Sequence, residues 1–521
     1  MSRSRQIAVN ALSQSGVTIL GAALGMVMVP FLIGKLGKDG YGLIAVTIAI
    51  SGVCALADLG ISGALGRQLA EALAKKDDGK YRELLSTALG LNLVIGLASA
   101  SALFVLASHL AKLFALPGSL FDTGVFLLRT YGATHVLFTF LTPSPQAVLA
   151  SHNRFDTSSR INAVRSLFQT AALFLVLART GAGIAGWAVV CVTTDAVCTF
   201  LLWRAAARTH IGLGMCVSAM RFSSVKELFR LGSQFTLLQL SGQLSVNADP
   251  FILTACLGPA SVSLYRPPGQ VLGTVSPLVF TLANQLHPLA TKAHVEGNKK
   301  DLADILFRGT KYTMLMGAPF CAIVIALAHP LCKIWLGKAL GEQYRICAAV
   351  LAVQAVTQLG AFAAGTQWPV LLGMRRTAFA AYGRLAFAVL NIIISWLLVR
   401  HTALGVLGVV LPTMVIELIW RPMLIHHVCR SLDVAVSEYL RQAYLSPLLI
   451  GGTVIVAGFA AVWFAPPEHL WSLAATAGAL ASFGAVLIWL AGFNLTERAA
   501  MVRVAHSCRM GAPFNLDISS Q

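Results

Sequence analysis

The sequence has few charged side chains, and most of those it has are positive. Only 12% of its 521 residues are charged, against 57% that are hydrophobic, and 21 acidic residues stand beside 39 Lys and Arg. So low a charged fraction excludes a water-soluble chain, whether globular or disordered. The mean hydropathy of +0.75 places the chain among membrane proteins instead.

Motifs for common chemistries are also missing. The ten cysteines are scattered without paired spacing, so we expect small buried thiols rather than disulfides or a metal site. The sequence has no Gly-rich phosphate loop of the Walker type, no nucleophile with a paired base and no histidine cluster. It therefore predicts no metal, no cofactor and no catalytic residue.

Fourteen apolar stretches follow one another along the chain, and most reach the roughly 20 residues that cross a membrane as a helix. Backbone polar groups in lipid must be satisfied within the segment, which requires helices here. The first stretch is too long for a signal peptide and is assigned as the first span. We expect an all-α polytopic membrane protein with spans at 9–33, 41–66, 84–108, 124–150, 160–178, 182–206, 228–258, 262–290, 310–328, 346–372, 379–399, 404–429, 444–465 and 469–491.

Positive charge is divided unevenly between the alternate loops that these spans define. Of the 39 Lys and Arg residues, 27 fall in one set of loops and the span ends that border them, a set that includes both chain ends, and four other Arg lie deeper inside spans. Loops that stay cytoplasmic keep Lys and Arg, so both termini are predicted to face the cytoplasm of a bacterial inner membrane. The outward set holds only Lys35, Lys38, Lys112, Arg179, Lys333, Lys338, Arg345 and Arg400.

This topology also narrows the function. The formal charge of +18 would suggest nucleic acid in a soluble domain, but here the cytoplasmic loops explain most of it, so no nucleic-acid partner is expected. The longest outward loop, about 329–345, has fewer than twenty residues. A membrane-embedded ligase or polymerase would need a larger outward segment to form a catalytic site. We therefore expect a transporter and not an enzyme.

A faint internal repeat relates the start of the chain to its middle. Both copies read Ser-Gln, Pro-Phe, Leu-Gly and Tyr in order: Ser13-Gln14, Pro30-Phe31, Leu36-Gly37 and Tyr41, then Ser233-Gln234, Pro250-Phe251, Leu257-Gly258 and Tyr265. Six predicted spans separate the copies, so the repeat is parallel, as in transporters whose substrate path lies between two halves. The expected parts are an N-terminal lobe 1–206, a linker 207–227, a C-terminal lobe 228–429, an interfacial connector 430–443, two extra helices 444–491 and a cytoplasmic tail 492–521.

Ionisable side chains inside the spans are the first candidates for a functional site, because charge in lipid is costly. Arg129 and Arg266 lie toward the outer ends of their spans, where we favour a wet cavity. Arg165 and Arg384 lie closer to the cytoplasmic face, where snorkelling to headgroups is the simpler interpretation. The acidic candidates, for ion coupling or ion pairing, are Asp58, Asp195, Asp249 and Glu417.

Polar side chains, most of them amides, recur every four residues on three predicted spans, a spacing that places them on one helical face. Interhelical hydrogen bonds, at about 0.6–2 kcal/mol each, would explain a few of them. Three amide stripes, one of which begins at an Arg, exceed what packing needs, so we predict that they line a cavity. The lining candidates are Gln239, Gln243, Asn247, Gln270, Gln354 and Gln358, with Gln14 of the first repeat copy.

Five segments of the sequence carry short motifs that point to the same protein family. They are VPFLIGKLGKDGYGL (29–43), LADLGISGALGR (56–67), NADPFILTACLG (247–258), HPLATKAHVEGNKKDL (287–302) and LCKIWLGK (331–338). Together they resemble the polysaccharide-transport (oligosaccharide flippase) branch of the multidrug/oligosaccharidyl-lipid/polysaccharide exporter superfamily. The resemblance covers nearly the whole chain, and Asp58 and Asp249 fall on acidic positions of the family pattern.

The resemblance implies an ATP-independent, two-lobed carrier with twelve or fourteen helices. Its implied cargo is undecaprenyl-pyrophosphate-linked oligosaccharide, moved from the cytoplasmic to the outer leaflet for O-antigen, capsule or exopolysaccharide. The four intramembrane arginines would then hold the pyrophosphate, and the amides would contact sugar. The implied partners are H+ or Na+ as a coupling ion, and a polysaccharide polymerase with its chain-length regulator.

Two other transport functions stay open at this point. A lipid II flippase of peptidoglycan synthesis also has fourteen helices and a cationic interior, and its loss would abolish viability. A multidrug or cation antiporter of the same superfamily would prefer an acidic or aromatic cavity. The equal numbers of intramembrane Arg and acidic residues weaken the antiporter hypothesis.

Overall fold

The computed structural model is built from helices, and no strand occurs in the part of the chain that it describes. That part is residues 3–58, 60–114, 116–210, 220–221, 224–226, 247–374 and 376–499, with side chains described from Gly16 onward except at 278, 281, 282 and 284. The predicted all-α class is confirmed. Most of the predicted linker 207–227 and of the tail 492–521 lies outside the described residues.

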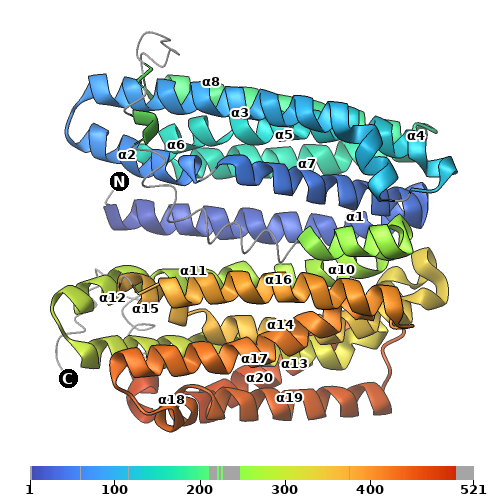
Figure 1. Ribbon diagram of the computed structural model, residues 1–521. Helices are drawn as coiled ribbons and strands as arrows, with labels where there is room; N and C mark the ends of the chain where they lie inside the picture. The colour runs from blue at the N-terminus through green and yellow to red at the C-terminus, as the bar shows by residue number, and fades with distance from the viewer. Residues whose placement is uncertain are drawn as a thin grey trace. The chain divides into compact units, whose positions relative to one another are not determined.

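The helices in the first part of the chain follow the apolar runs and end at turn residues. α1 contains the first predicted span and most of the second, which are separated by a kink at Gly37. The elements up to residue 210 are α1 (Arg3–Cys54), η1 (Ala55–Asp58), α2 (Ile61–Ala74), α3 (Asp78–Leu113), α4 (Gly118–Leu127), η2 (Leu128–Gly132), α5 (Ala133–Leu141), α6 (Pro143–Ser151), α7 (Phe155–Arg179) and α8 (Gly183–Thr209) (Figure 1).

The second part begins with a helix over residues 247–257. It continues with η4 (Pro259–Ser261), α10 (Val262–Gly273), α11 (Ser276–Asn284), α12 (Leu286–Val295), α13 (Lys299–Leu340), η5 (Gly341–Gln343), α14 (Tyr344–Ala364), α15 (Gln367–Gly373), α16 (Ala378–His401), α17 (Leu407–Leu432), α18 (Val436–Ala443), α19 (Leu445–Phe464), α20 (Leu470–Leu487) and η6 (Ile488–Gly492).

Ten helical segments among the described residues are long and apolar enough to cross a membrane. Two of them, Gly16–Asp58 with 43 residues and Lys299–Gly373 with 75, are longer than one crossing requires. Residues 227–246, in the predicted seventh span, are outside the described part. The structure thus shows a multi-pass membrane protein, and the count of fourteen spans stays a prediction.

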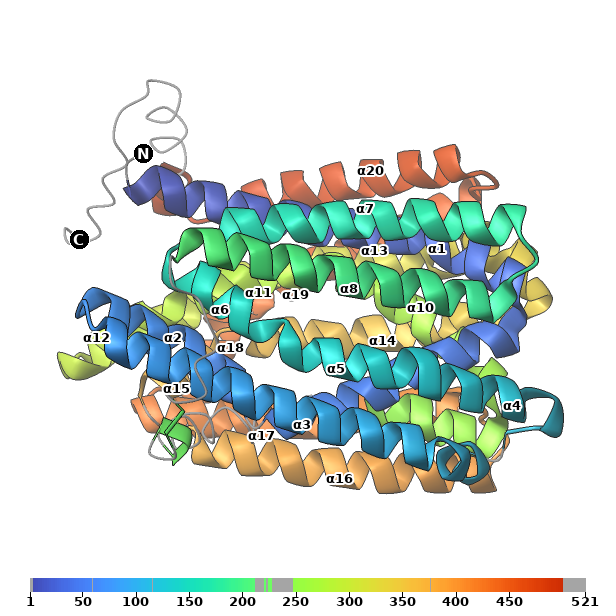
Figure 2. The ribbon, with the colours of Figure 1, turned by 90° about the horizontal axis from the view of Figure 1, so that it is seen from above.

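The chain forms two compact units. Unit 1 comprises Met1–Leu278, Trp335–Gln354 and Thr377–Trp420, and unit 2 comprises Val279–Ile334, Ala355–Arg376 and Arg421–Gln521. In unit 1, α3 packs along α5, α7 packs along α8, and α1 contacts both α7 and α10 (Figure 2). Leucine side chains of α2 and α3, with the ring of Tyr81, form one of its cores. The division into two six-helix lobes stays a prediction.

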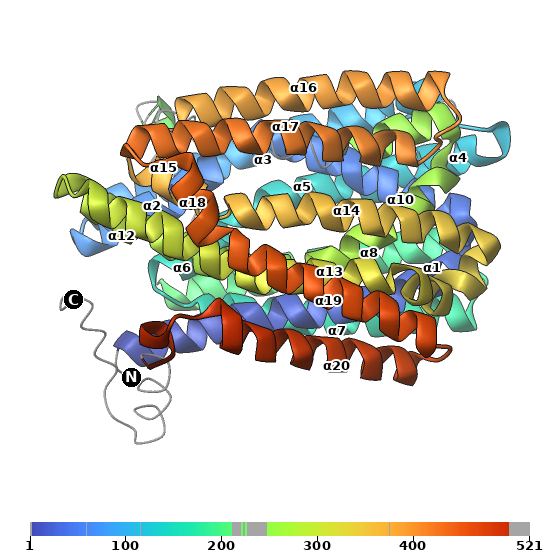
Figure 3. The same ribbon diagram turned by 90° about the horizontal axis from the view of Figure 1, so that it is seen from below.

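Unit 2 holds the last two long helices. Leu473 and Leu480 of α20 pack on Leu327 of α13, and α19 runs beside α20 (Figure 3). The predicted connector 430–443 contains α18, which buries Tyr439 and exposes Leu440. The Tyr439 hydroxyl bonds the Thr310 hydroxyl at 2.8 Å, which fixes this short helix to α13.

Within the same unit, an ion pair joins Glu497, five residues after η6, to α13. Lys311 Nζ and the Tyr312 hydroxyl donate to Glu497 at 2.8 and 2.9 Å. Burial raises the pKa of the Glu497 carboxyl, but these donors and the Asn494 amide outweigh that effect and hold its pKa below the ordinary value. The ionised carboxylate therefore anchors the chain where it leaves the last helix.

The two repeat copies share an unusual backbone conformation at their Leu-Gly pairs. Gly37 has φ 74° and ψ 172°, and Gly258 has φ 85° and ψ 166°. This region of backbone space is almost closed to residues with a Cβ. The turn after Gly258 packs so closely on Gly42 that a Cβ at Gly42 would lie 1.9 Å from the Pro259 carbonyl oxygen. The turns of the two copies therefore meet through backbone.

Gly42 offers a direct test of this close contact. We expect Gly42→Ala to lower the thermal stability of the purified protein, by about 1–3 kcal/mol if the backbones part to admit the methyl group. Gly34→Ala is the matched control, because a Cβ there would meet nothing within 4 Å. Equal melting temperatures for the two variants would contradict the contact.

Candidate functional site

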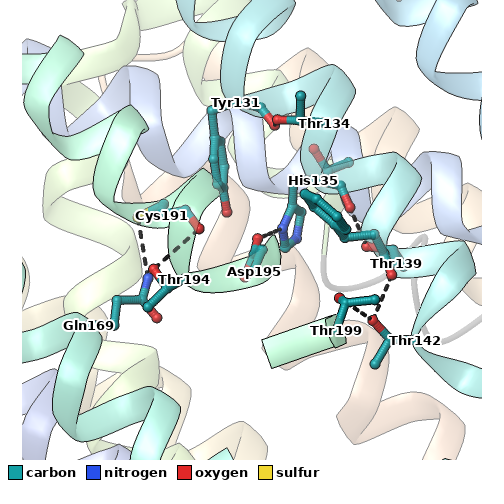
Figure 4. Close-up of polar contacts among 12 residues, drawn as sticks. Tyr131, Thr134, His135, Thr139, Thr142, Gln169, Cys191, Thr194, Asp195 and Thr199 are labelled. Atoms are coloured by element: carbon teal, nitrogen blue, oxygen red, sulfur yellow. Dashed lines mark hydrogen bonds and ion pairs between the residues drawn. The ribbon is translucent and has the colours of Figure 1, made fainter. Parts of the chain in front are cut away.

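Three helices of unit 1 bring ionisable side chains together in the middle of the membrane span. Asp195 lies halfway along α8, and its carboxylate accepts hydrogen bonds from Arg165 on α7 and from His135 on α5. The His135 Nδ1 lies 2.7 Å from the nearer Asp195 oxygen (Figure 4). An ionised carboxylate only accepts, so Nδ1 is the donor and Nε2 stays available. Asp195 is 6% exposed, whereas the Arg165 and His135 side chains keep 35% and 26% of their surface.

Aromatic rings fix the orientation of His135. The Tyr131 ring stacks on the imidazole with centroids 5.0 Å apart, and Trp187 meets Tyr131 edge-on at 4.6 Å. Tyr131 belongs to η2, a single π-helical turn between α4 and α5. Such turns change which side chains share a face and are frequent at functional sites. On the neighbouring turns, Gln169 donates to Cys191 at 3.2 Å (Figure 4).

The position of Arg165 differs from the simpler interpretation of its sequence context. Its guanidinium is held by Asp195 in the span, so snorkelling to headgroups does not describe it. Sequence reasoning also missed His135, which contacts the same carboxylate. An imidazole inside an apolar stretch is itself a signal, because histidine is among the ionisable residues that are rare in spans.

A second polar group lies where α10 packs against α1. Arg266 of α10 is close enough to the hydroxyls of Tyr41 and Tyr265 to act on them electrostatically. These are the matched tyrosines of the two repeat copies. The Arg266 Nε is buried without a hydrogen-bond partner, and none of the described carboxylates pairs with this guanidinium. Arg266 is thus a cation whose charge the described part of the protein leaves uncompensated.

Asp249 lies beside Tyr265 and, like Arg266, has a buried polar atom without a hydrogen-bond partner. The Tyr265 hydroxyl donates to Asp249 Oδ2 at 2.7 Å. The other oxygen, Oδ1, is buried without a partner, and the residue is only 2% exposed. No described Lys, Arg or His forms an ion pair with it, in contrast to Asp195, which has two basic neighbours.

Three amide side chains lie close to glycines of α1 and α10, where the absence of a Cβ leaves room for them. The Asn247 amide nitrogen would lie 3.2 Å from a Cβ at Gly52, and the Gln270 amide nitrogen 3.0 Å from a Cβ at Gly25. The Gln354 side-chain oxygen is buried near α10 without a partner. Three of the predicted lining residues therefore belong to helices 247–257, α10 and α14 of unit 1, as does Arg266.

The remaining basic candidates lie apart from Arg266. Arg129 donates its Nε to the Phe104 carbonyl oxygen at 3.3 Å and lies over the Phe104 ring at 5.3 Å. Arg384, on α16, is half-buried and makes no hydrogen bond or ion pair with the described residues.

The other candidates have varied surroundings. Asp58 accepts from the Ser62 amide and hydroxyl, which caps the start of α2. Glu417 is half-buried on α17 of unit 1, and Gln358 lies in unit 2. The side chains of Gln14, Gln239 and Gln243 lie outside the described residues.

The fold is shared with known transporters. A multidrug resistance MATE family transporter of the MOP superfamily, in its inward-facing conformation, matches with a TM-score of 0.69 at 13% identity, over 82% of this chain and 98% of that one. Lipid II flippase MurJ, in an inward closed conformation, matches with a TM-score of 0.70 at 14% identity, over 96% of this chain and all of the other. At these identities the likeness concerns the fold alone.

Sequence comparison then gives the family. The chain belongs to the polysaccharide biosynthesis protein family, whose pattern matches residues 36–345. It is also 22% identical, over 319 residues, to the uncharacterized membrane protein EpsK of Bacillus subtilis (strain 168), a match that spans 61% of this chain and 63% of EpsK. The resemblance seen in the short motifs is confirmed at the level of the polysaccharide biosynthesis protein family.

Proposed function

We propose that this chain is a flippase for undecaprenyl-pyrophosphate-linked oligosaccharide. It carries this cargo by alternating access from the cytoplasmic to the outer leaflet of the bacterial inner membrane, with both termini in the cytoplasm. The product serves surface polysaccharide such as O-antigen, capsule or exopolysaccharide. The observation that supports this proposal most is Arg266, a half-buried residue whose Nε is buried without a hydrogen-bond partner and which has no carboxylate partner among the described residues.

An unpaired guanidinium in a membrane span needs a counter-charge. Burying such a cation alone is costly, so its retention points to an anionic ligand. A pyrophosphate suits it, because the guanidinium fork matches phosphate oxygens with two parallel hydrogen bonds. Arg165 is less suited to this role, since Asp195 already neutralises it. Asn247, Gln270 and Gln354 supply donors and acceptors for sugar hydroxyls.

Asp249 is the carboxyl best suited to bind a coupling ion, H+ or Na+. It is buried, one oxygen has no partner, and no described cation pairs with it. A carboxylate in such a site is strongly favoured to take up a proton or a small cation. Inward movement of that ion would drive outward movement of the cargo.

We expect Asp249→Asn to transport cargo without responding to an ion gradient. The amide keeps the size of the side chain but binds neither ion. The measurement is the transport rate in vesicles with an imposed proton gradient, then with a sodium gradient. Asp39→Asn, at an exposed position of α1, is the control and should keep the wild-type response. An unchanged gradient response in Asp249→Asn would remove Asp249 from coupling.

Depletion of the protein from its cells tests the cargo. We expect surface polysaccharide to disappear and its lipid-linked precursor to accumulate in the cytoplasmic leaflet while growth continues. Loss of viability would favour a lipid II flippase instead, and normal polysaccharide with raised sensitivity to organic cations would favour an antiporter. Polymer formation by the purified protein would support a membrane-embedded ligase or polymerase instead of a transporter.

A further inference from the structure

Pro30 interrupts the hydrogen bonding of α1, and a residue distant in the sequence donates to the backbone carbonyl that is left without a partner. Pro30 has no N–H, so the Met26 carbonyl four residues earlier loses its helical partner. The indole Nε1 of Trp335, near the end of α13, donates to this oxygen at 2.7 Å. The two residues are 309 positions apart and both belong to unit 1.

Two further hydrogen bonds link the same parts of the chain, but here the donor lies on α1 and the acceptors lie at the end of α13 and in η5. Leu340 is the last residue of α13, where the final carbonyls of a helix have no partner within it. Lys38, just after the kink at Gly37, donates to the Leu340 carbonyl at 3.1 Å and to the Gln343 side-chain oxygen at 2.6 Å. A cation is also favoured at a helix C-terminus by the helix dipole.

We propose that these contacts form a latch that holds the outer side of the transporter closed. The latch consists of the Trp335–Met26 bond and the bonds from Lys38 to Leu340 and Gln343. Lys38 and Gln343 come from two different loops that the charge distribution assigns to the outside. This inference rests on the proposed alternating access: opening of the site to the outside would separate the part of α1 around the kink at Gly37 from the end of α13, and the latch bonds would then break.

The chemistry of the latch makes it reversible. The Met26 and Leu340 carbonyls need donors, because a bare carbonyl away from water is costly. Only another protein donor or water can replace Trp335 and Lys38. Breaking the latch is therefore cheap only as water enters, so outward opening and hydration of the outer side proceed together. This inference does not depend on the identity of the cargo.

Cys347 is a natural reporter for the latch. It is fully buried and lies four residues after Gln343, in the outer turn of α14. We expect a membrane-impermeant, charged thiol reagent added to the outside to modify Cys347 faster when the latch is weakened. The experiment uses the full chain with all its cysteines and quantifies Cys347 modification by mass spectrometry.

Trp335→Phe keeps the ring and removes the donor, and Lys38→Met keeps the length and removes the charge. Each variant should raise the rate of Cys347 modification by roughly threefold to thirtyfold, the range expected for one interhelical hydrogen bond in a membrane. The matched controls are Trp463→Phe and Lys35→Met, both at exposed positions, and they should leave the rate unchanged.

A double-mutant cycle tests the role of the carbonyl itself. Pro30→Ala restores an N–H that takes the Met26 carbonyl back into the helix and leaves Trp335 without its acceptor. Trp335→Phe should then add little to the rate already raised by Pro30→Ala. Independent, multiplying effects of these two changes would overturn the latch at Met26. Wild-type rates in both Trp335→Phe and Lys38→Met would overturn the latch altogether.

Discussion

Replacement of Asp195 by alanine is expected to remove most of the folded protein from the membrane. Asp195 is the carboxylate that compensates the Arg165 guanidinium in the middle of the span. Loss of one partner of a fully buried pair costs about 3–5 kcal/mol, and the 35% exposure of the Arg165 side chain places this pair toward the lower end of that range, still a large share of the roughly 5–15 kcal/mol that typically holds a domain together. The measurement is membrane abundance, together with thermal unfolding of the purified variant.

Removal of both charges should reverse this loss. In Arg165→Met combined with Asp195→Leu no buried charge is left alone, so abundance should recover toward that of the wild type. Asp39→Ala, at an exposed position of α1, is the control for loss of an acidic residue. If Asp195→Ala is as stable as the wild type, the ion pair does not hold these helices together. If the double variant is stable but no longer transports, the pair also contributes to function.

The second large effect concerns ligand binding at Arg266. We expect Arg266→Ala to weaken binding of a short prenyl diphosphate probe by about tenfold to a hundredfold, because hydrogen bonds to charged groups contribute about 1.5–3 kcal/mol. Arg266→Lys should be intermediate, since an ammonium group lacks the two-pronged geometry. Calorimetric titration of the purified protein gives both values.

Stability provides an independent criterion for Arg266. Its removal leaves no described carboxylate unpaired, so Arg266→Ala should not lower the melting temperature, in contrast to Asp195→Ala. Arg179→Ala, at an exposed helix end, should change neither binding nor stability. A destabilised Arg266→Ala variant with normal binding would assign Arg266 a structural role only.

Much of the fold follows from the sequence. Apolar length predicts the helices, because lipid forces the backbone to satisfy its own hydrogen bonds. The matched Leu-Gly pairs mark equivalent positions of the repeat, and in the structure Gly37 and Gly258 share one rare conformation. The close approach of Gly42 to Pro259 could not be predicted, because it depends on how two distant turns pack.

The candidate site is less predictable for the same reason. Depth along a span can be estimated from residue position, but the partner of a side chain depends on helix rotation and neighbours. The sequence offers Arg165 and Asp195 as separate candidates and does not indicate that they contact each other. His135 is a single histidine in an apolar stretch, so no motif points to it. The π-helical turn at Leu128–Gly132, which sets the register next to His135, carries no sequence signal that we recognise.

Reconstitution of transport tests the central claim most directly. Purified protein in liposomes should move undecaprenyl-pyrophosphate-linked oligosaccharide from one leaflet to the other, measured by access of the sugar to an enzyme outside the vesicle. The wild type and Arg179→Ala are expected to transport, and Arg266→Ala is expected to fall toward the rate of empty liposomes. Undiminished transport by Arg266→Ala, or no transport by the wild type, would contradict the proposal that Arg266 holds the diphosphate during transport.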